Sequence, residues 1–293
     1  MTVDIFQSIT RAGCDERAFV LAAVGIASEI SFDGLKYSLA VELGDATAAL
    51  NHLIPYESER QVGQGQLIKP LPAPRVHGGV WIGAAAYGAV LVGIALAISN
   101  GLWPADAFER GLLDAGKVQS GQWWRAWTAL TLHWDAAHLV ANLGAGIWFG
   151  TLAARQLGSG STWLLVVTGA ATANLFDALF GPVSYRSAGA STAVFTALGL
   201  MAAHSWRSRF HLPQRWALRW APLVAGVVLL GWFGSAGEGT DLVAHALGFM
   251  VGGALGITAA VPTVDGLLNR IPQWLTGLAA GASLAIAWAC ALA

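Results

Sequence analysis

Seven long stretches of the chain are mostly apolar and contain no Asp, Glu, Lys or Arg. They are 18 to 30 residues long and cover residues 76–105, 136–154, 156–176, 187–206, 220–237, 242–264 and 271–293. A helix of about 20 residues crosses the hydrocarbon core of a bilayer, so each stretch is long enough for one span. Helices are expected because a segment in lipid must satisfy its own backbone hydrogen bonds. The pattern therefore predicts seven transmembrane helices, near 79–99, 136–154, 161–176, 189–206, 219–235, 242–261 and within 266–293.

The first 62 residues follow a shorter and more polar pattern. Asp33-Gly34 is a strong hairpin signal between two short strand-like runs, and a helical pattern lies on each side of them. We expect a helix from an Asp15 cap to Val24, strands at 28–32 and 36–41, and a helix at 45–59. These elements would form a small cytoplasmic α/β domain. No catalytic constellation lies in it, which favours a regulatory or docking role with a partner that the sequence does not identify.

The other segments complete the predicted domain organisation. Residues 63–76 contain three prolines and are expected to be a linker. Residues 77–265 form the membrane core with six of the spans, and residues 266–293 form a seventh, C-terminal transmembrane helix. The predicted fold class is thus an all-α polytopic membrane protein preceded by a small soluble α/β domain.

Composition supports a membrane protein. Hydrophobic residues make up 55% of the chain and charged residues only 11%, and the mean hydropathy is +0.56. A soluble domain has about 25% charged residues, so this chain lacks the polar surface of one. Sixteen basic residues against 17 acidic ones leave no strongly basic face for nucleic acid. We therefore expect a lipid bilayer as the surroundings, with no nucleic-acid partner, no metal and no cofactor.

Basic residues set the expected orientation. If the N-terminus is cytoplasmic, the cytoplasmic segments hold 12 of the 16 Lys and Arg residues. The positive-inside rule therefore places the N-terminus in the cytoplasm and the C-terminus outside. The segment between the first two spans lies outside and is expected to rest in the outer leaflet, because tryptophan prefers the membrane interface. Its tryptophans are Trp103, Trp123, Trp124, Trp127 and Trp134.

Four polar residues stand out within the predicted spans, where polarity is costly and indicates function. They are His138, Asn142, Ser191 and His245. Their spans all enter from the outer side, and the two histidines and the serine lie three to five residues past a charged residue. Three helices thus place these side chains at one depth, roughly 5–8 Å below the outer surface.

This set of side chains fits acyl transfer. A serine hydroxyl attacks a carbonyl when a neutral imidazole takes its proton, and the developing oxyanion needs donors aimed at it. His138 and Asn142 share one helix face and can both donate. No carboxylate lies in this layer within a span, which favours a Ser–His dyad. A serine in a membrane helix more often only bonds to its own backbone. Gly189 before Ser191 argues against that reading by freeing the backbone at a helix start.

Two further features concern histidines. Gly248 and Gly252 lie on the same face as His245, and such a small-residue face lets helices approach closely. We therefore expect His245 to pack against the span of Ser191. His133 lies at the outer boundary, and we interpret it as structural or interfacial.

Together these stretches resemble the rhomboid family of intramembrane serine proteases. The resemblance covers about residues 120–260. It is carried by Trp124-Arg125, His133-x4-His138-x3-Asn142, Leu157-Gly158-Ser159, Gly189-x-Ser191 and Ala244-His245-x2-Gly248-x3-Gly252. It implies a six-helix core, to which the seventh span and the N-terminal domain are additions. It also implies transmembrane proteins as substrates and cleavage in or near their membrane segments.

The resemblance assigns roles to residues. Ser191 would be the nucleophile and His245 the base, while His138, Asn142 and the backbone of Ala190 and Ser191 would form the oxyanion hole. Structural support is implied for Gly189, Gly248, Gly252, Phe195, Trp124 and Arg125. The expected location is the inner (plasma) membrane of a bacterium, with the active site opening to the outer side.

Three residues depart from the family pattern. Thr192 follows the nucleophile where many members have glycine, and Phe195 lacks the hydroxyl of the more usual tyrosine. Ala154 replaces an acidic residue that commonly precedes the Leu-Gly-Ser turn, so the first loop is expected to be anchored differently. None of these changes removes a chemical group from the dyad.

Other classes of protein fit the sequence less well. A zinc intramembrane protease would need His-Glu-x-x-His, and His133 and His138 are five residues apart, off one helix face. A transporter would show internal repeats or paired broken helices. The alternative is a rhomboid-like pseudoprotease that binds or escorts membrane proteins without cleaving them. Such relatives are expected to have lost the serine or the histidine, whereas both are present here.

Overall fold

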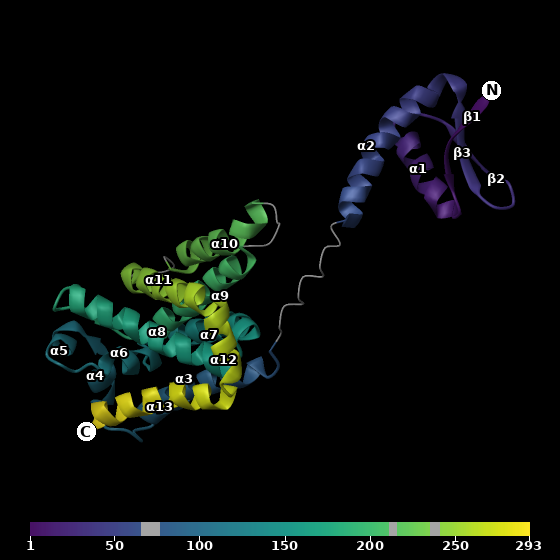
Figure 1. The fold of residues 1–293 in the computed structure, drawn as a ribbon. Coiled ribbons are helices and arrows are strands. Elements are labelled where there is room, and N and C mark those ends of the chain that lie inside the picture. The colour runs from purple at the N-terminus through teal and green to yellow at the C-terminus, as the bar shows by residue number, and fades with distance from the viewer. Residues whose placement is uncertain (66–76, 211–215, 235–240) are drawn as a thin grey trace. The chain divides into compact units, whose positions relative to one another are not determined.

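The computed structural model describes residues 1–65, 77–210, 216–234 and 241–293. The chain divides into two compact units, Met1–Ala73 and Pro74–Ala293 (Figure 1). The first unit contains strands and helices, and the second is a helical body. The predicted fold class, an all-α membrane protein preceded by a small α/β domain, is confirmed.

The N-terminal unit contains one strand more than the sequence pattern indicated. An antiparallel sheet of order β1-β3-β2 packs against two helices. The hairpin forms as predicted, with Asp33 Oδ1 accepting hydrogen bonds from the backbone of Leu35 and Lys36, both at 2.8 Å. The elements are β1 Thr2–Ser8, α1 Arg11–Ala23, β2 Ser28–Phe32, β3 Tyr37–Glu42, η1 Leu43–Asp45 and α2 Ala46–Gly65.

Two expectations for this unit are wrong. The first helix is capped by Thr10, whose hydroxyl accepts from the Gly13 N–H at 3.3 Å, and so it starts before Asp15. Residues 63–65 of the expected linker at 63–76 instead belong to α2, which continues to Gly65, and residues 66–76 lie outside the described residues.

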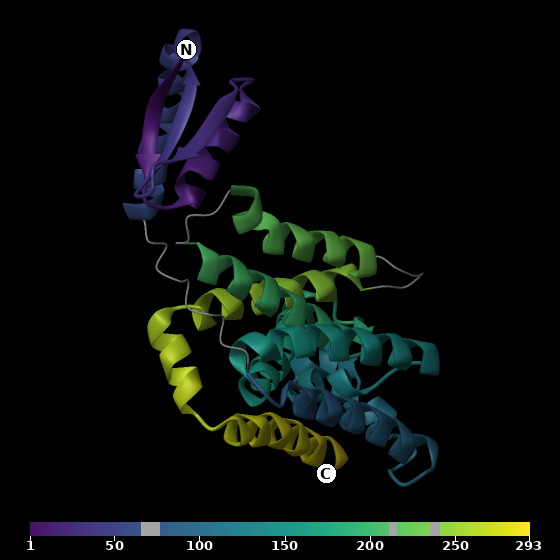
Figure 2. The same ribbon diagram turned by 90° about the vertical axis from the view of Figure 1, so that its right-hand side faces the viewer.

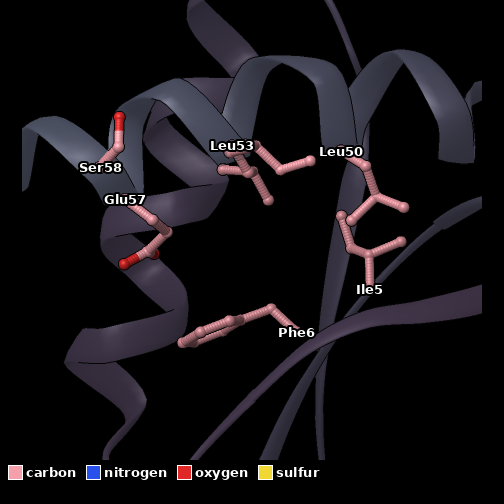
Figure 3. Close-up of a pocket in the computed structure, with 7 residues that line it drawn as sticks. Ile5, Phe6, Leu50, Leu53, Glu57 and Ser58 are labelled. Atoms are coloured by element: carbon pink, nitrogen blue, oxygen red, sulfur yellow. The ribbon is translucent and has the colours of Figure 1, made fainter.

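An apolar groove of about 320 Å³ lies between β1 and α2 (Figure 3). Glu57 is its one titratable group, and Arg17 Nε donates to that carboxylate at 2.6 Å. The groove thus offers apolar contact and a neutralised carboxylate, with no group arranged for catalysis. Its lining residues are Ile5, Phe6, Leu50, Leu53, Ile54, Glu57 and Ser58.

The second unit has a long helix in each of the seven predicted spans. Five of them are long and apolar enough to cross a membrane, and a sixth, α10, contains a shorter apolar helix at Trp216–Trp232. The seven helices are α3 Val80–Ser99, α7 Ala136–Leu157, α8 Ser159–Phe180, α9 Ser191–Arg209, α10 Trp216–Gly234, α11 Leu242–Ala259 and α13 Gln273–Leu292.

The helix that does not reach this apolarity, α9, is the central one. It packs against α7, α8, α10 and α11, and most of its residues from Thr192 to Ala203 are buried. Its side chains therefore meet other helices instead of lipid, and it tolerates Ser191, Thr192 and Thr196. The sequence pattern indicated this helix because residues 187–206 contain no Asp, Glu, Lys or Arg. Its low hydropathy follows from its central position.

The C-terminal span differs from its expected bounds. The predicted segment 266–293 is divided into α12, Pro262–Arg270, and α13, with Pro272 at the N-cap of α13. Proline lacks the backbone N–H that the interior of a helix needs, so Pro272 favours the start of a new helix over continuation of α12. Helix α12 leads from the end of α11 to the start of α13 (Figure 2).

The segment between α3 and α7 is folded. It contains α4 Ala107–Gly111, β4 Leu113–Asp114, α5 Ala115–Gln119, α6 Arg125–Thr128 and η2 Ala129–Thr131. Strand β4 pairs with β5, Arg186–Ser187, which lies just before α9. Through this pairing, a segment expected to lie in the outer leaflet is connected to the entry of α9.

Candidate active site

The candidate site lies where the N-terminal turns of three helices meet. His138 is the third residue of α7, Ser191 the first of α9 and His245 the fourth of α11. Asp135 and Asp241 cap α7 and α11, accepting from the N–H groups of His138 at 2.8 Å and Ala244 at 2.9 Å. Helix N-termini carry partial positive charge, so their convergence favours a negative charge between them.

Gly189 brings the ring of His138 next to Ser191. A Cβ at position 189 would lie 2.8 Å from His138 Cε1, 3.0 Å from His138 Nε2 and 3.6 Å from Ser191 Oγ. Only the hydrogen of glycine leaves room for the imidazole at this point. The backbone of Gly189 is not in the left-handed region, so the reason for glycine is space, whereas the sequence had pointed to backbone freedom.

Asn142 supplies a buried donor one turn along α7. Its side chain is 6% exposed, and Nδ2 is buried without a hydrogen-bond partner among the described residues. Its backbone carbonyl accepts from the Tyr87 hydroxyl at 2.9 Å, which fixes this turn of α7 against α3. A buried amide donor left unpaired costs about 1–3 kcal/mol, so it marks a place where an acceptor is favoured.

His245 is held on α11 by Phe195 of α9. The two ring centroids are 4.4 Å apart, and His245 is 6% exposed. The phenyl ring alone provides this contact, so the missing hydroxyl at position 195 does not prevent it. Ser191 itself is half-buried at the start of α9.

The glycine face of α11 lies along the backbone of α9. A Cβ on Gly248 would be 2.7 Å from the carbonyl oxygen of Thr192, and one on Gly252 would overlap the carbonyl of Thr196. Gly256 meets Leu200 in the same way one turn further. The Thr192 side chain is 4% exposed and fits within this contact, so threonine is accommodated after Ser191.

His133 belongs to the site, which the sequence interpretation did not bring out. Its Nε2 accepts from the Ala190 N–H at 3.3 Å, and its ring meets that of His138 edge-on, with centroids 5.1 Å apart. Burial, and then the charge of His138, lower the pKa of His133 to about 4. The imidazole is therefore neutral near pH 7 and able to accept.

This hydrogen bond affects the two backbone N–H groups, of Ala190 and Ser191, that the family resemblance assigns to the oxyanion hole. The Ala190 N–H is already paired with His133. The Ser191 N–H lies in the first turn of α9, where helix geometry supplies no intrahelical acceptor. The Ser191 N–H is therefore better placed than the Ala190 N–H to donate to a new acceptor.

Arg125 anchors the segment before α7. Its guanidinium is buried and donates to the carbonyls of Glu109 at 2.9 Å and Leu112 at 2.7 Å and to the Gln122 side chain at 2.7 Å. Position 154 of α7 is an alanine, not the acidic residue common in the family. In this chain Arg125 is instead held by two backbone carbonyls and the Gln122 side chain. Trp124 packs with Leu112 and Leu132 in the same region.

A further contact at the start of α11 was not visible in the sequence. The Tyr185 hydroxyl donates to Asp241 Oδ2, while Asp241 Oδ1 caps α11. Burial raises the pKa of Tyr185, so the hydroxyl keeps its proton and remains a donor. The two residues are 56 positions apart, and no local pattern connects them.

Among the described residues, no group of three or more His, Cys, Asp or Glu side chains could hold a metal ion. The chemistry that the site offers from its own side chains is that of a hydroxyl, an imidazole and hydrogen-bond donors.

Two comparisons with known proteins bear on this site. Residues 120–261 match the family model described as the Rhomboid domain. Over 91 residues the chain is 36% identical to the rhomboid protease GluP of Bacillus subtilis (strain 168), a match that covers 31% of this chain and 18% of that protein. The matched domain contains the five site residues His133, His138, Asn142, Ser191 and His245.

Proposed function

This chain is a rhomboid-family protein through residues 120–261, and from that premise we propose that it is an intramembrane serine endopeptidase. It hydrolyses peptide bonds in or near the membrane segments of transmembrane proteins, using Ser191 and His245 as a dyad. The observation that carries the proposal is the space at Gly189, where the His138 ring and Ser191 Oγ both lie within 3.6 Å of one point.

In the first half of the reaction, Ser191 Oγ attacks the carbonyl carbon of the substrate and His245 takes the hydroxyl proton. The carbonyl oxygen becomes an oxyanion, which accepts from His138, Asn142 Nδ2 and the Ser191 N–H. Collapse of this intermediate breaks the C–N bond, and His245 returns the proton to the leaving amine. The new N-terminus departs and an acyl-enzyme ester remains on Ser191.

The second half regenerates the enzyme. His245 takes a proton from water, whose oxygen attacks the ester, and the same donors receive the second oxyanion. Expulsion of Ser191 Oγ, which regains its proton from His245, releases the new C-terminus. Donors fixed before the reaction need not reorganise during it, which is why buried, orphaned groups such as Asn142 Nδ2 are suited to the task.

Orientation and cleavage position form part of the proposal. With the N-terminal unit in the cytoplasm of a bacterial cell, the N-terminal ends of α7, α9 and α11 face the outer side of the plasma membrane. Substrates are then cut near the outer end of their membrane segment. A helical peptide bond is shielded by its own turn, so residues that weaken helices, such as glycine and proline, favour cleavage.

A fluorophosphonate probe and a single-span substrate test the proposal. Labelling and cleavage are expected for the wild-type protein and lost in Ser191→Ala. The control is Ser283→Ala, which removes a serine of α13 whose hydroxyl donates to the Ala280 carbonyl of the same helix. A wild-type protein that binds the substrate but is neither labelled nor able to cleave would instead be a pseudoprotease. Fragment masses give the position of the cut.

A further inference from the structure

The seventh helix reaches the segment next to the candidate active site. Helix α13 lies outside the matched rhomboid domain, alongside α4 and α6 (Figure 1). From it, Trp288 Nε1 donates to Thr131 Oγ1 at 3.0 Å. Both side chains are buried, with 5% of Trp288 and 2% of Thr131 exposed. A hydrogen bond between residues 157 positions apart thus joins α13 to the end of η2.

The indole ring of Trp288 occupies a closely fitted site. Its centroid is 4.6 Å from that of Trp103, and a Cβ on Gly111 would be 2.5 Å from Trp288 Cη2. Leu112 and Leu132 belong to the same buried cluster. In contrast, Trp274 of the same helix is 66% exposed. One tryptophan of α13 is therefore built into the protein interior while the other is at its surface.

The segment that Trp288 contacts, residues 129–133, is also bonded to the two residues that precede α9. The Gly189 N–H donates to the Ala129 carbonyl at 3.0 Å, and the Ala190 N–H donates to His133 Nε2 at 3.3 Å. Thr131 lies between these two attachment points in the sequence, and its hydroxyl also donates to the Thr128 carbonyl at 2.7 Å. Residues 129–133 thus contact Trp288 on one side and the two residues before Ser191 on the other.

We propose that Trp288 is a positioning residue for peptide hydrolysis, which acts through Thr131 and residues 129–133 to hold Ser191 in register with its oxyanion donors. The inference rests on the proposed function. Its physical basis is that small displacements of a reacting group are costly: a misplacement of about 1 Å costs on the order of 10²-fold in rate. The effect falls on turnover, since Trp288 is buried behind the segment and does not meet the substrate.

Two substitutions remove the hydrogen bond from opposite ends. Trp288→Phe keeps an aromatic ring without the N–H, and Thr131→Val keeps the shape of threonine without the hydroxyl. In full-length protein, each is expected to lower kcat about tenfold with KM changed less than twofold, a partial displacement on the scale above. Thr131→Ser restores the acceptor and is expected to recover wild-type kcat. The double variant should be no slower than the slower single variant, because both remove the same contact.

Trp274→Phe is the matched control, because it makes the same change at an exposed position of α13 and is expected to leave kcat unchanged. An unchanged kcat in Thr131→Val or Trp288→Phe, or a raised KM with kcat unchanged, would overturn the positioning role. Cleavage by the wild-type protein would still support the proposed function in that case. A wild-type protein that neither cleaves nor reacts with the probe would overturn both. Thermal unfolding of each variant shows that kcat is compared on folded protein.

Discussion

Gly252 of α11 lies directly against the backbone carbonyl of Thr196 in α9, with no room for a side chain between them. Gly248 and Gly256 make the same kind of approach one turn before and one turn after. Close backbone approach through small residues is a common way to join membrane helices. Here it sets the distance between the helix that carries His245 and the helix that starts at Ser191.

We expect Gly252→Ala to separate these two helices. Overpacking of this kind costs typically 1–3 kcal/mol, and it moves His245 away from Ser191 without altering either. The midpoint temperature of thermal unfolding and kcat should both fall. Gly253→Ala is the neighbouring control, because its Cβ would be 3.9 Å from Ala203 Cβ, an ordinary contact. Equal behaviour of the two variants would show that the contact at Gly252 is not needed.

Gly189→Ala tests the space beside Ser191. The new methyl group would displace the His138 ring, and we expect kcat to fall on the order of 10²-fold, because a displaced donor no longer meets the oxyanion. Gly144→Ala adds a methyl group to the same helix as His138 with nothing within 4 Å, and it should be silent. A fully active Gly189→Ala would place His138 outside the reaction.

Asn142→Ala and His138→Ala test the oxyanion donors. Loss of one fixed donor costs about 10²- to 10³-fold in kcat, and KM should change little because the donors act on the transition state. Asn100→Ala, at an exposed position after α3, is the control. A pair of variants with normal kcat and raised KM would identify these residues as substrate contacts.

His133 makes stability depend on pH. Its pKa of about 4 in the folded protein lies below the ordinary value of 6.5, so between these pH values the unfolded chain binds more protons. The contribution of His133 to the free energy of unfolding is therefore constant above pH 6.5 and decreases as pH falls towards 4. His133→Gln removes this titration and should lose less thermal stability between about pH 7 and pH 5 than the wild type.

His52→Gln, at an exposed position of the N-terminal unit, should keep the pH dependence of the wild type. If His133→Gln and the wild type had the same pH dependence, His133 would not be the group that titrates.

Much of the membrane architecture was determined by the sequence alone. Lipid excludes charge and requires helices, so the charge-free stretches predicted the seven long helices of the second unit, including α9, which is less apolar than the others. The same punctuation placed His138, Ser191 and His245 near the N-terminal ends of their helices. Asp33-Gly34 likewise predicted a hairpin, because the turn depends on local backbone preference.

Only the tertiary structure decided which groups meet. A helical period assigns a residue to a face but does not say which neighbour that face contacts, so the approach of His138 to Gly189 was not readable from their spacing. The bonds from Ala190 to His133, from Tyr185 to Asp241 and from Trp288 to Thr131 join residues 56 to 157 positions apart. Such pairs depend on helix rotation and loop path, which are set by the packing of the whole bundle and not by any local stretch.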